Sequence, residues 1–306
     1  MKSAYPTNPY VEAVRRKVHE ERRQALNPVG RYLDGVVSLP PPPMVMTQLL
    51  ALFRDPDRDI DQVVQVIRYE PSLTAQILRT CNSACFAGEQ PIGDIFDAVT
   101  RMGFYQVYCL VVSLFGASTR SIPGADKGVN VEELWRHSVA AAVSASVVEQ
   151  EQDGEAKAAA FTAGLLRDIG RLVFASTEQE SYAKLIQRAR DQGVPLFSME
   201  RSVLGIDHAE LGGELLRRWE LPPDIVAAVA HHHNFEAGPR YEHLTAIVQV
   251  GEMIGDRLLD RDLADTGLLT GSSATLETLQ LTPDDFPHLV AKAQAEMDKV
   301  QGMLGI

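Results

Sequence analysis

The sequence contains Ala163-Gly-Leu-Leu-Arg-Asp-Ile-Gly-Arg-Leu-Val173, a stretch that places a carboxylate where a helix would otherwise be apolar. At helical spacing, this face carries the carboxylate of Asp168 and the apolar residues Leu165, Ile169, Leu172 and Val173. Such a face is expected to lie against a core, and a buried carboxylate is costly unless a cation, a metal ion or several donors compensate its charge. The stretch therefore predicts charged or polar partners for Asp168 inside the fold.

Histidines on the inward faces of other predicted helices are the candidate partners. They are His137, three residues after Leu134, His208, which shares a stripe with Leu211 and Leu215, and the pair His232 and His233 after Val229. The neighbouring His231 is expected to be exposed, and Glu252 could supply a further oxygen ligand. Together, imidazole and carboxylate ligands suit Zn, Mn, Fe or Ni, on which a bound water can become a nucleophile. Any one of these histidines alone would be more typical of a hydrogen-bonded core residue.

Composition limits the classes of function. The 306 residues are 45% hydrophobic, enough for one large domain or two smaller ones, and the net charge of -12 argues against a nucleic-acid or anionic-membrane surface. The odd number of cysteines (Cys81, Cys85 and Cys109) predicts reduced, mostly buried thiols, as in cytoplasmic proteins. The first residues lack the apolar segment of a signal peptide, and the apolar run over 107–117 is too short to span a bilayer. We therefore expect a soluble cytoplasmic protein.

Almost every periodic segment predicts helix, so the expected fold is all-α. The expected helices cover residues 9–26, 44–53, 60–69, 71–81, 95–102, 107–115, 131–151, 155–176, 178–192, 198–203, 207–219, 222–234, 241–259 and about 282–304. The β-branched residues of 107–115 leave a strand as an alternative there. A linker at Ser121–Gly128 is expected to divide an N-terminal lobe (39–120) from a second lobe (131–259), with helical extensions at 1–38 and 260–306.

Taken jointly, several motifs resemble the HDOD branch of the HD superfamily over about Leu39 to Leu259. The motifs are Leu39-Pro-Pro-Pro-Pro43, Glu70-Pro-Ser-Leu73, Asn82-Ser83, Ala98-Val-Thr-Arg-Met-Gly103, Leu134-Trp-Arg-His137, Gly164-Leu-Leu-Arg-Asp-Ile-Gly170, Asp207-His-Ala-Glu-Leu-Gly212, Trp219-Glu-Leu-Pro222 and His232-His-Asn234. Two positions depart from the pattern: Arg101 stands in a usually apolar position, and Glu70 where Asp is common.

This resemblance implies an all-α fold in which an N-terminal helical lobe packs on an HD-like helical lobe, with a signalling or regulatory role. In active HD enzymes, metal is bound at the positions that match His137, Asp168, His208 and the His232/His233 pair. Those enzymes carry a second histidine where this chain has Arg167, and a guanidinium cannot bind metal. The resemblance therefore implies a degraded phosphohydrolase site.

The sequence predicts a non-catalytic cytoplasmic regulatory protein with no cofactor. Its pocket, built from His137, Arg167, Asp168, His208, His232 and His233, would be structural or would bind a ligand or a partner. Signalling proteins are the expected partners and a small nucleotide is a candidate ligand, whereas nucleic acid and membrane are not expected. The oligomeric state is left open.

Two alternatives stay open. The first is a metal-dependent phosphohydrolase acting on a nucleotide or cyclic dinucleotide, with one Zn, Mn or Fe ion held by His137, Asp168, His208, His232, His233 and Glu252. The second is an interaction scaffold without a small-molecule site. The Gly-Tyr-Pro motif of relatives that hydrolyse cyclic di-GMP is missing after Asn234, which argues against that substrate.

Overall fold

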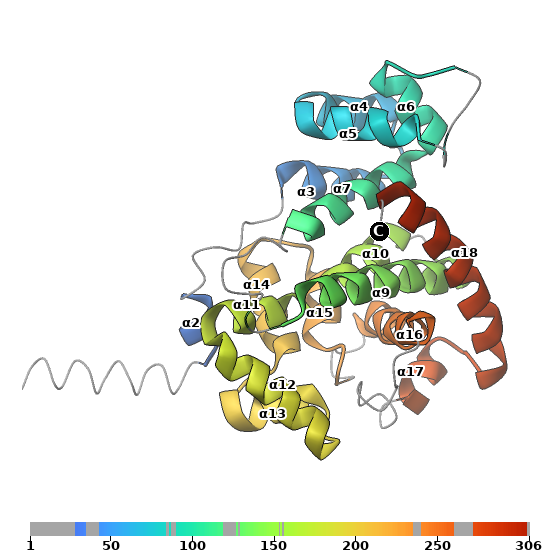
Figure 1. The fold of residues 1–306 in the computed structure, drawn as a ribbon. Coiled ribbons are helices and arrows are strands. Elements are labelled where there is room, and N and C mark those ends of the chain that lie inside the picture. The colour runs from blue at the N-terminus through green and yellow to red at the C-terminus, as the bar shows by residue number, and fades with distance from the viewer. Residues whose placement is uncertain are drawn as a thin grey trace, which may run out of the picture.

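The structure is a computed structural model, and it describes residues 28–34, 43–83, 86, 90–118, 127, 129–152, 154, 156–234, 240–259 and 272–304. Within these ranges all regular structure is helical, as the sequence predicts (Figure 1). The elements are α2 (Pro28–Leu33), α3 (Met44–Phe53), α4 (Ile60–Arg68), α5 (Pro71–Cys81), α6 (Ile95–Met102), α7 (Phe104–Ser118), α9 (Val131–Glu151), α10 (Lys157–Leu166), α11 (Ile169–Glu178), α12 (Glu180–Gln192), α13 (Leu196–Leu204), α14 (His208–Arg218), α15 (Pro223–Ala230), α16 (Glu242–Leu258), α17 (Ser272–Thr278), the 3-10 turn η4 (Pro283–Asp285) and α18 (Phe286–Leu304).

Helices α3 to α7 form the N-terminal lobe, with α7 against the second lobe (Figure 1). The turns between these helices follow local chemistry. Asp59 caps α4 in a capping box with Gln62, and Asp94 accepts hydrogen bonds from the first backbone N–H groups of α6. Gly103, at a φ of 81°, ends α6 in a conformation that glycine adopts without steric cost. These caps fix where each short helix begins and ends.

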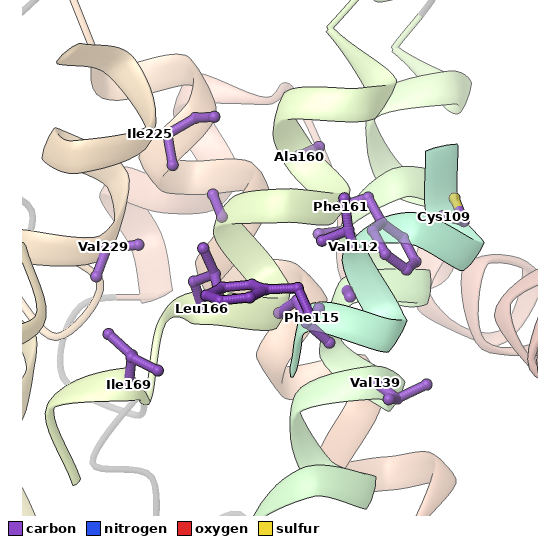
Figure 2. Packing of buried hydrophobic residues seen from close by; sticks show 14 of the residues in the cluster. Cys109, Val112, Phe115, Val139, Ala160, Phe161, Leu166, Ile169, Ile225 and Val229 are labelled. Carbon is purple, nitrogen blue, oxygen red and sulfur yellow. The ribbon is translucent and has the colours of Figure 1, made fainter. Parts of the chain in front are cut away.

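Side chains of α7 join the two lobes through the core. Figure 2 shows Val112 and Phe115 of α7 lying beside Phe161 and Leu166 of α10. All four are buried, so the lobes share one apolar core. An aromatic contact extends this core, because the ring of Phe53 stacks on Phe104 at 4.2 Å.

Small residues let α16 pack closely on α9, which lies at the centre of the second lobe. A Cβ added at Gly251 would lie 2.7 Å from the backbone of Ala145, and one at Gly255 would lie 2.9 Å from the backbone N of Ala141. The close approach matters for the site, because Gly251 and Gly255 each directly precede an acidic residue of α16. It brings those carboxylates beside the buried face of α9.

Two predicted helices end earlier than expected. The helix expected over 155–176 is divided into α10 and α11 by a turn at Arg167 and Asp168, and the helix expected over 222–234 ends at Ala230. In the first case Arg167 Nη1 donates to the carbonyl of Gly164 at 3.0 Å, which occupies an acceptor that a continuous helix would use. In the second, His232 Nδ1 lies 2.7 Å from the carbonyl of Val229 and competes in the same way.

Other differences are smaller. Residues 107–115 form part of α7, so the strand alternative is wrong, and the short helices α2 and α17 were not predicted. Cys81 and Cys109 are buried free thiols, as expected. The expected helix at 9–26, Cys85 and most of the linker Ser121–Gly128 lie outside the described residues.

The length and hydropathy of the helices bear on whether the chain could cross a membrane. In the part of the chain that the structure describes, no single helix is long and apolar enough to cross a membrane, and only α6 and α7 counted together across a 102° bend meet that test.

Candidate functional site: a buried cluster of histidines, carboxylates and arginine

Asp168 lies at the centre of the site, in the turn between α10 and α11. Its side chain is 4% exposed, with Oδ2 3.0 Å from Arg167 Nη2 and 3.5 Å from His137 Nδ1, and Oδ1 3.2 Å from His208 Nε2. Burial alone raises the pKa of the Asp168 carboxyl, but Arg167 and hydrogen bonds from His137 and His208 bring that pKa well below its usual range. Asp168 is therefore an ionised carboxylate inside the fold.

Arg167 is the largest fully buried side chain of the described residues. Its Nη2 lies 2.9 Å from the ring nitrogens of His137, and its Nε lies 3.6 Å from Glu252 Oε1. Together with the contacts to Asp168 and Gly164, these place a permanent cation between α9, α10 and α16. The guanidinium takes the position between a histidine and two carboxylates in which a metal ion would find its ligands.

On the other side of Asp168, a buried carboxylate orients His208. Glu200 Oε2 lies 2.6 Å from His208 Nδ1 and accepts the backbone N–H of His208 at 2.8 Å, while Tyr182 Oη donates to Glu200 Oε1 at 2.5 Å. Burial lowers the pKa of His208, but the carboxylates of Glu200 and Asp168 outweigh this and raise it to about 10. This arrangement directs His208 Nε2 towards Asp168 and the following histidine pair.

His232 and His233 lie in the turn after α15. His233 Nε2 is 2.8 Å from His208 Nε2, and the His233 ring stacks on Phe197 at 4.6 Å. Among the described residues, the buried atoms His232 Nε2 and His233 Nδ1 have no hydrogen-bond partner. Burial lowers the pKa of His232 to about 3 and that of His233 well below its usual range, so both imidazoles are neutral. Neutral imidazoles with an unused nitrogen are suited to bind metal.

The cluster contains two groups of possible metal ligands. Within each group, the ligand atoms all lie within 4.8 Å of one another. One group is His208, His232 and His233, and the other is His137, Glu252 and Asp256. The first group offers the neutral imidazoles of His232 and His233, but His208, whose pKa is about 10, would have to release a proton before it could bind an ion. The second does not fit an ion, because Arg167 contacts His137 and lies beside Glu252, and His137 Nε2 is 2.6 Å from Asp256 Oδ1.

The structure brings all the sequence-predicted site residues into this one cluster. They are His137, Arg167, Asp168, His208, His232, His233 and Glu252. His231, expected to be exposed, is half-buried and lies 3.2 Å from Asn234 Oδ1 through its Nδ1. A cavity of about 60 Å³ reaches the cluster between α12, α13 and α16.

Sequence reasoning missed three residues of the cluster: Asp256, Glu200 and Tyr182. Asp256 follows Glu252 by four residues and so lies on the same face of α16, a signal that was available. Glu200 lies four residues after Leu196 and four before Leu204, so it too interrupts an apolar face. No sequence pattern singles out Tyr182, whose role depends on its contact with Glu200.

Comparison with known proteins places this chain in a family. The model of the HDOD domain family matches residues 39–235, which is more than half of the chain. The chain belongs to the HDOD domain family. The chain is also 26% identical over 236 residues to an uncharacterized protein of Treponema pallidum, a match that covers 76% of this chain and 45% of that protein. It thus matches less than half the length of that relative.

Solved structures of HDOD-like proteins share the fold. An HDOD domain protein of unknown function from Geobacter sulfurreducens is 22% identical, with a TM-score of 0.73 over 90% of this chain and 96% of the other. A protein of Marinobacter aquaeolei VT8, provisionally named a signal transduction protein, is 22% identical, with a TM-score of 0.71 over 92% of this chain and 65% of the other. A protein of Shewanella amazonensis SB2B, provisionally named a phosphohydrolase, is 23% identical, with a TM-score of 0.65 over 90% and 96%. At these identities the likeness concerns the fold.

Proposed function

We propose that this HDOD protein is a non-catalytic regulatory protein, in which the guanidinium of Arg167 replaces a catalytic metal. The observation that carries the proposal is the position of Arg167, fully buried and in contact with both His137 and Asp168. In this account the cluster holds the helices of the second lobe in one arrangement and offers a pocket to a ligand or a signalling partner. The proposal includes a cytoplasmic location, which the free thiols of Cys81 and Cys109 support.

Electrostatics is the physical reason for expecting no turnover. A divalent ion placed on His137, Glu252 and Asp256 would lie beside the guanidinium, and in a buried site this repulsion amounts to several kcal/mol. Losing the ion would also lose the metal-bound water that serves as nucleophile in metal-dependent hydrolysis. Arg167 cannot replace that function, because a guanidinium neither binds metal nor gives up its proton.

The first prediction concerns activity. Purified protein supplied with Mn²⁺ or Fe²⁺ is expected to release no nitrophenol from bis(p-nitrophenyl) phosphate above the rate of the Asp168→Ala variant. Cyclic di-GMP and nucleoside monophosphates are expected to stay intact in the same assay. Steady turnover that disappears in Asp168→Ala would contradict the proposal.

The alternative function is a phosphohydrolase with a single metal ion. It is favoured by the group of His208, His232 and His233, in which buried His232 Nε2 has no hydrogen-bond partner among the described residues. Asp168 Oδ1, 3.2 Å from His208 Nε2, could complete the ligands with an oxygen. One ion here would still have Arg167 on the far side of Asp168.

Elemental analysis of protein purified without a polyhistidine tag tests this alternative. The regulatory account expects metal below about a tenth of an equivalent at neutral pH, both in the wild type and in His208→Ala. Stoichiometric metal that is lost in His208→Ala, together with phosphodiester turnover, would favour the alternative. Because imidazole binds metal only when neutral and the pKa of His208 is about 10, such an ion should be held more tightly as the pH rises from 7 towards 10.

A further inference from the structure

A second cavity lies beside the histidine cluster, at the outer surface of α9 and α12. Its volume is about 600 Å³, within the range of small-molecule sites. The charged residues that line it are Lys127, Glu132, Glu133, Arg171 and Arg190, and Ile186 contributes apolar surface. Arg171, Ile186 and Arg190 also line the smaller cavity that reaches the cluster, so the two cavities share one wall.

Two of the three cations that line the cavity, Arg190 and Lys127, have no ion pair among the described residues, and both are exposed. Arg171 is mostly buried and forms an ion pair with Asp168 through Nη1 and Oδ1 at 3.9 Å. Burial lowers the pKa of Arg171, but Asp168 and the nearby Tyr182 and Glu200 outweigh this and raise that pKa. The guanidinium of Arg190, at the cavity wall and without an ion pair in the described ranges, matches the paired oxygens of a phosphate or carboxylate.

The acidic residues that line the cavity come from α9. Glu132 and Glu133 belong to the first turn of α9, are exposed, and already have contacts within the protein. Arg171, by contrast, is the deep charge, at the wall shared with the inner cavity. An anionic group would therefore meet Arg171 and Arg190 at the inner side, with Ile186 beside the rest of the molecule.

We infer that this cavity binds a small anionic metabolite, whose phosphate or carboxylate group lies between Arg171 and Arg190, with Lys127 as a third cation. The inference rests on the proposed function, because it supplies the ligand class for a pocket that performs no reaction. Arg171 would connect the ligand to the buried cluster, since the same guanidinium faces Asp168. Ligand binding would thus act on Asp168, in the centre of the second lobe, through the side chain of Arg171.

Calorimetric titration of the full chain tests the site, with three probes: AMP and pyrophosphate for phosphate groups, and citrate for carboxylates. We expect at least one probe to bind in a saturable manner, with a Kd that rises with NaCl concentration. The probe that binds shows which oxyanion the site prefers. Arg190→Gln should raise the Kd by about tenfold, the loss of one charge-assisted contact.

Arg188→Gln is the matched control, because Arg188 is an exposed arginine of the same helix that does not line the cavity. It removes the same charge and should leave the Kd within about twofold. Arg171→Gln should weaken binding further, and Lys127→Gln keeps the test informative if Arg171→Gln fails to fold. Absence of binding by all three probes at millimolar concentration would overturn the inference, as would an equal Kd in wild type, Arg190→Gln and Lys127→Gln.

The same samples separate this inference from the proposed function. After titration, the AMP and pyrophosphate samples are assayed for released inorganic phosphate. Binding that depends on Arg190 without phosphate release supports both ideas. Phosphate release would overturn the non-catalytic proposal and leave the binding site standing, whereas no binding and no release would overturn the site alone.

Discussion

Replacing Arg167 with Met is expected to lower the free energy of unfolding by about 3–5 kcal/mol, because it leaves the buried Asp168 carboxylate without its closest cation. Methionine keeps much of the side-chain volume, so the loss reports charge more than cavity formation. Urea unfolding at pH 7, followed by circular dichroism, provides the measurement.

The control and the double variant show whether the charge pair is responsible. Arg31→Met removes an ion pair of similar length, 2.9 Å to Glu178, but at a side chain that is 54% exposed, and it should cost less than about 1 kcal/mol. Asp168→Asn removes the opposite charge, so Arg167→Met combined with Asp168→Asn should cost clearly less than the sum of the single variants. Additive losses, or an Arg167→Met protein as stable as wild type, would show that the pair does not stabilise the fold.

The second large effect is a stability maximum near neutral pH in protein treated with chelator. The pKa of His208 is about 10 in the fold and about 6.5 when unfolded, so its contribution is complete below pH 6.5 and is lost as the pH rises towards 10. The pKa of His232 is lowered to about 3, so the unfolded chain binds a proton that the fold does not, and stability falls as the pH drops from 6.5 towards 3. His233 acts in the same direction as His232.

Urea midpoints between pH 4.5 and 9.5 measure this profile. The alkaline decrease should amount to several kcal/mol and should become much shallower in Glu200→Gln, because Glu200 is the main cause of the raised pKa of His208. Glu210→Gln is a suitable control, since it removes an exposed carboxylate of a neighbouring surface ion pair with Arg201. A profile that rises from pH 6.5 to 9.5, or one that Glu200→Gln leaves unchanged, would contradict the assignment.

Local patterns predicted the helices better than the turns between them. The apolar period of α9 and the caps of α4 and α6 depend on residues close together in the sequence. The predicted limits of α9, 131–151, agree with the structure. The break at Arg167 and Asp168 has no such signal, because apolar spacing continues through it. It arises where the Arg167 side chain takes a helical carbonyl, and where Gly170 packs against the backbone of His208. Both are contacts that form only in the folded chain.

The same distinction applies to the site. An inward carboxylate and inward histidines could be recognised one helix at a time, and their convergence followed from the family resemblance. The separate roles of Arg167 and His208 could not be predicted, because they depend on which oxygen of Asp168 each side chain contacts. The sequence shows Arg167 beside Asp168, but only the structure shows its guanidinium facing His137 and Glu252 while His208 is oriented by Glu200.

The most direct test of the account is the number of Mn²⁺ ions bound by wild type and by Arg167→His, measured by elemental analysis after equilibrium dialysis. The substitution removes the buried cation and restores an imidazole between His137 and Asp168. The account predicts less than about a tenth of an ion per chain in the wild type and about one ion per chain in Arg167→His. A stoichiometric ion in the wild type, or equal numbers in both proteins, would contradict the claim that Arg167 stands in the place of a metal.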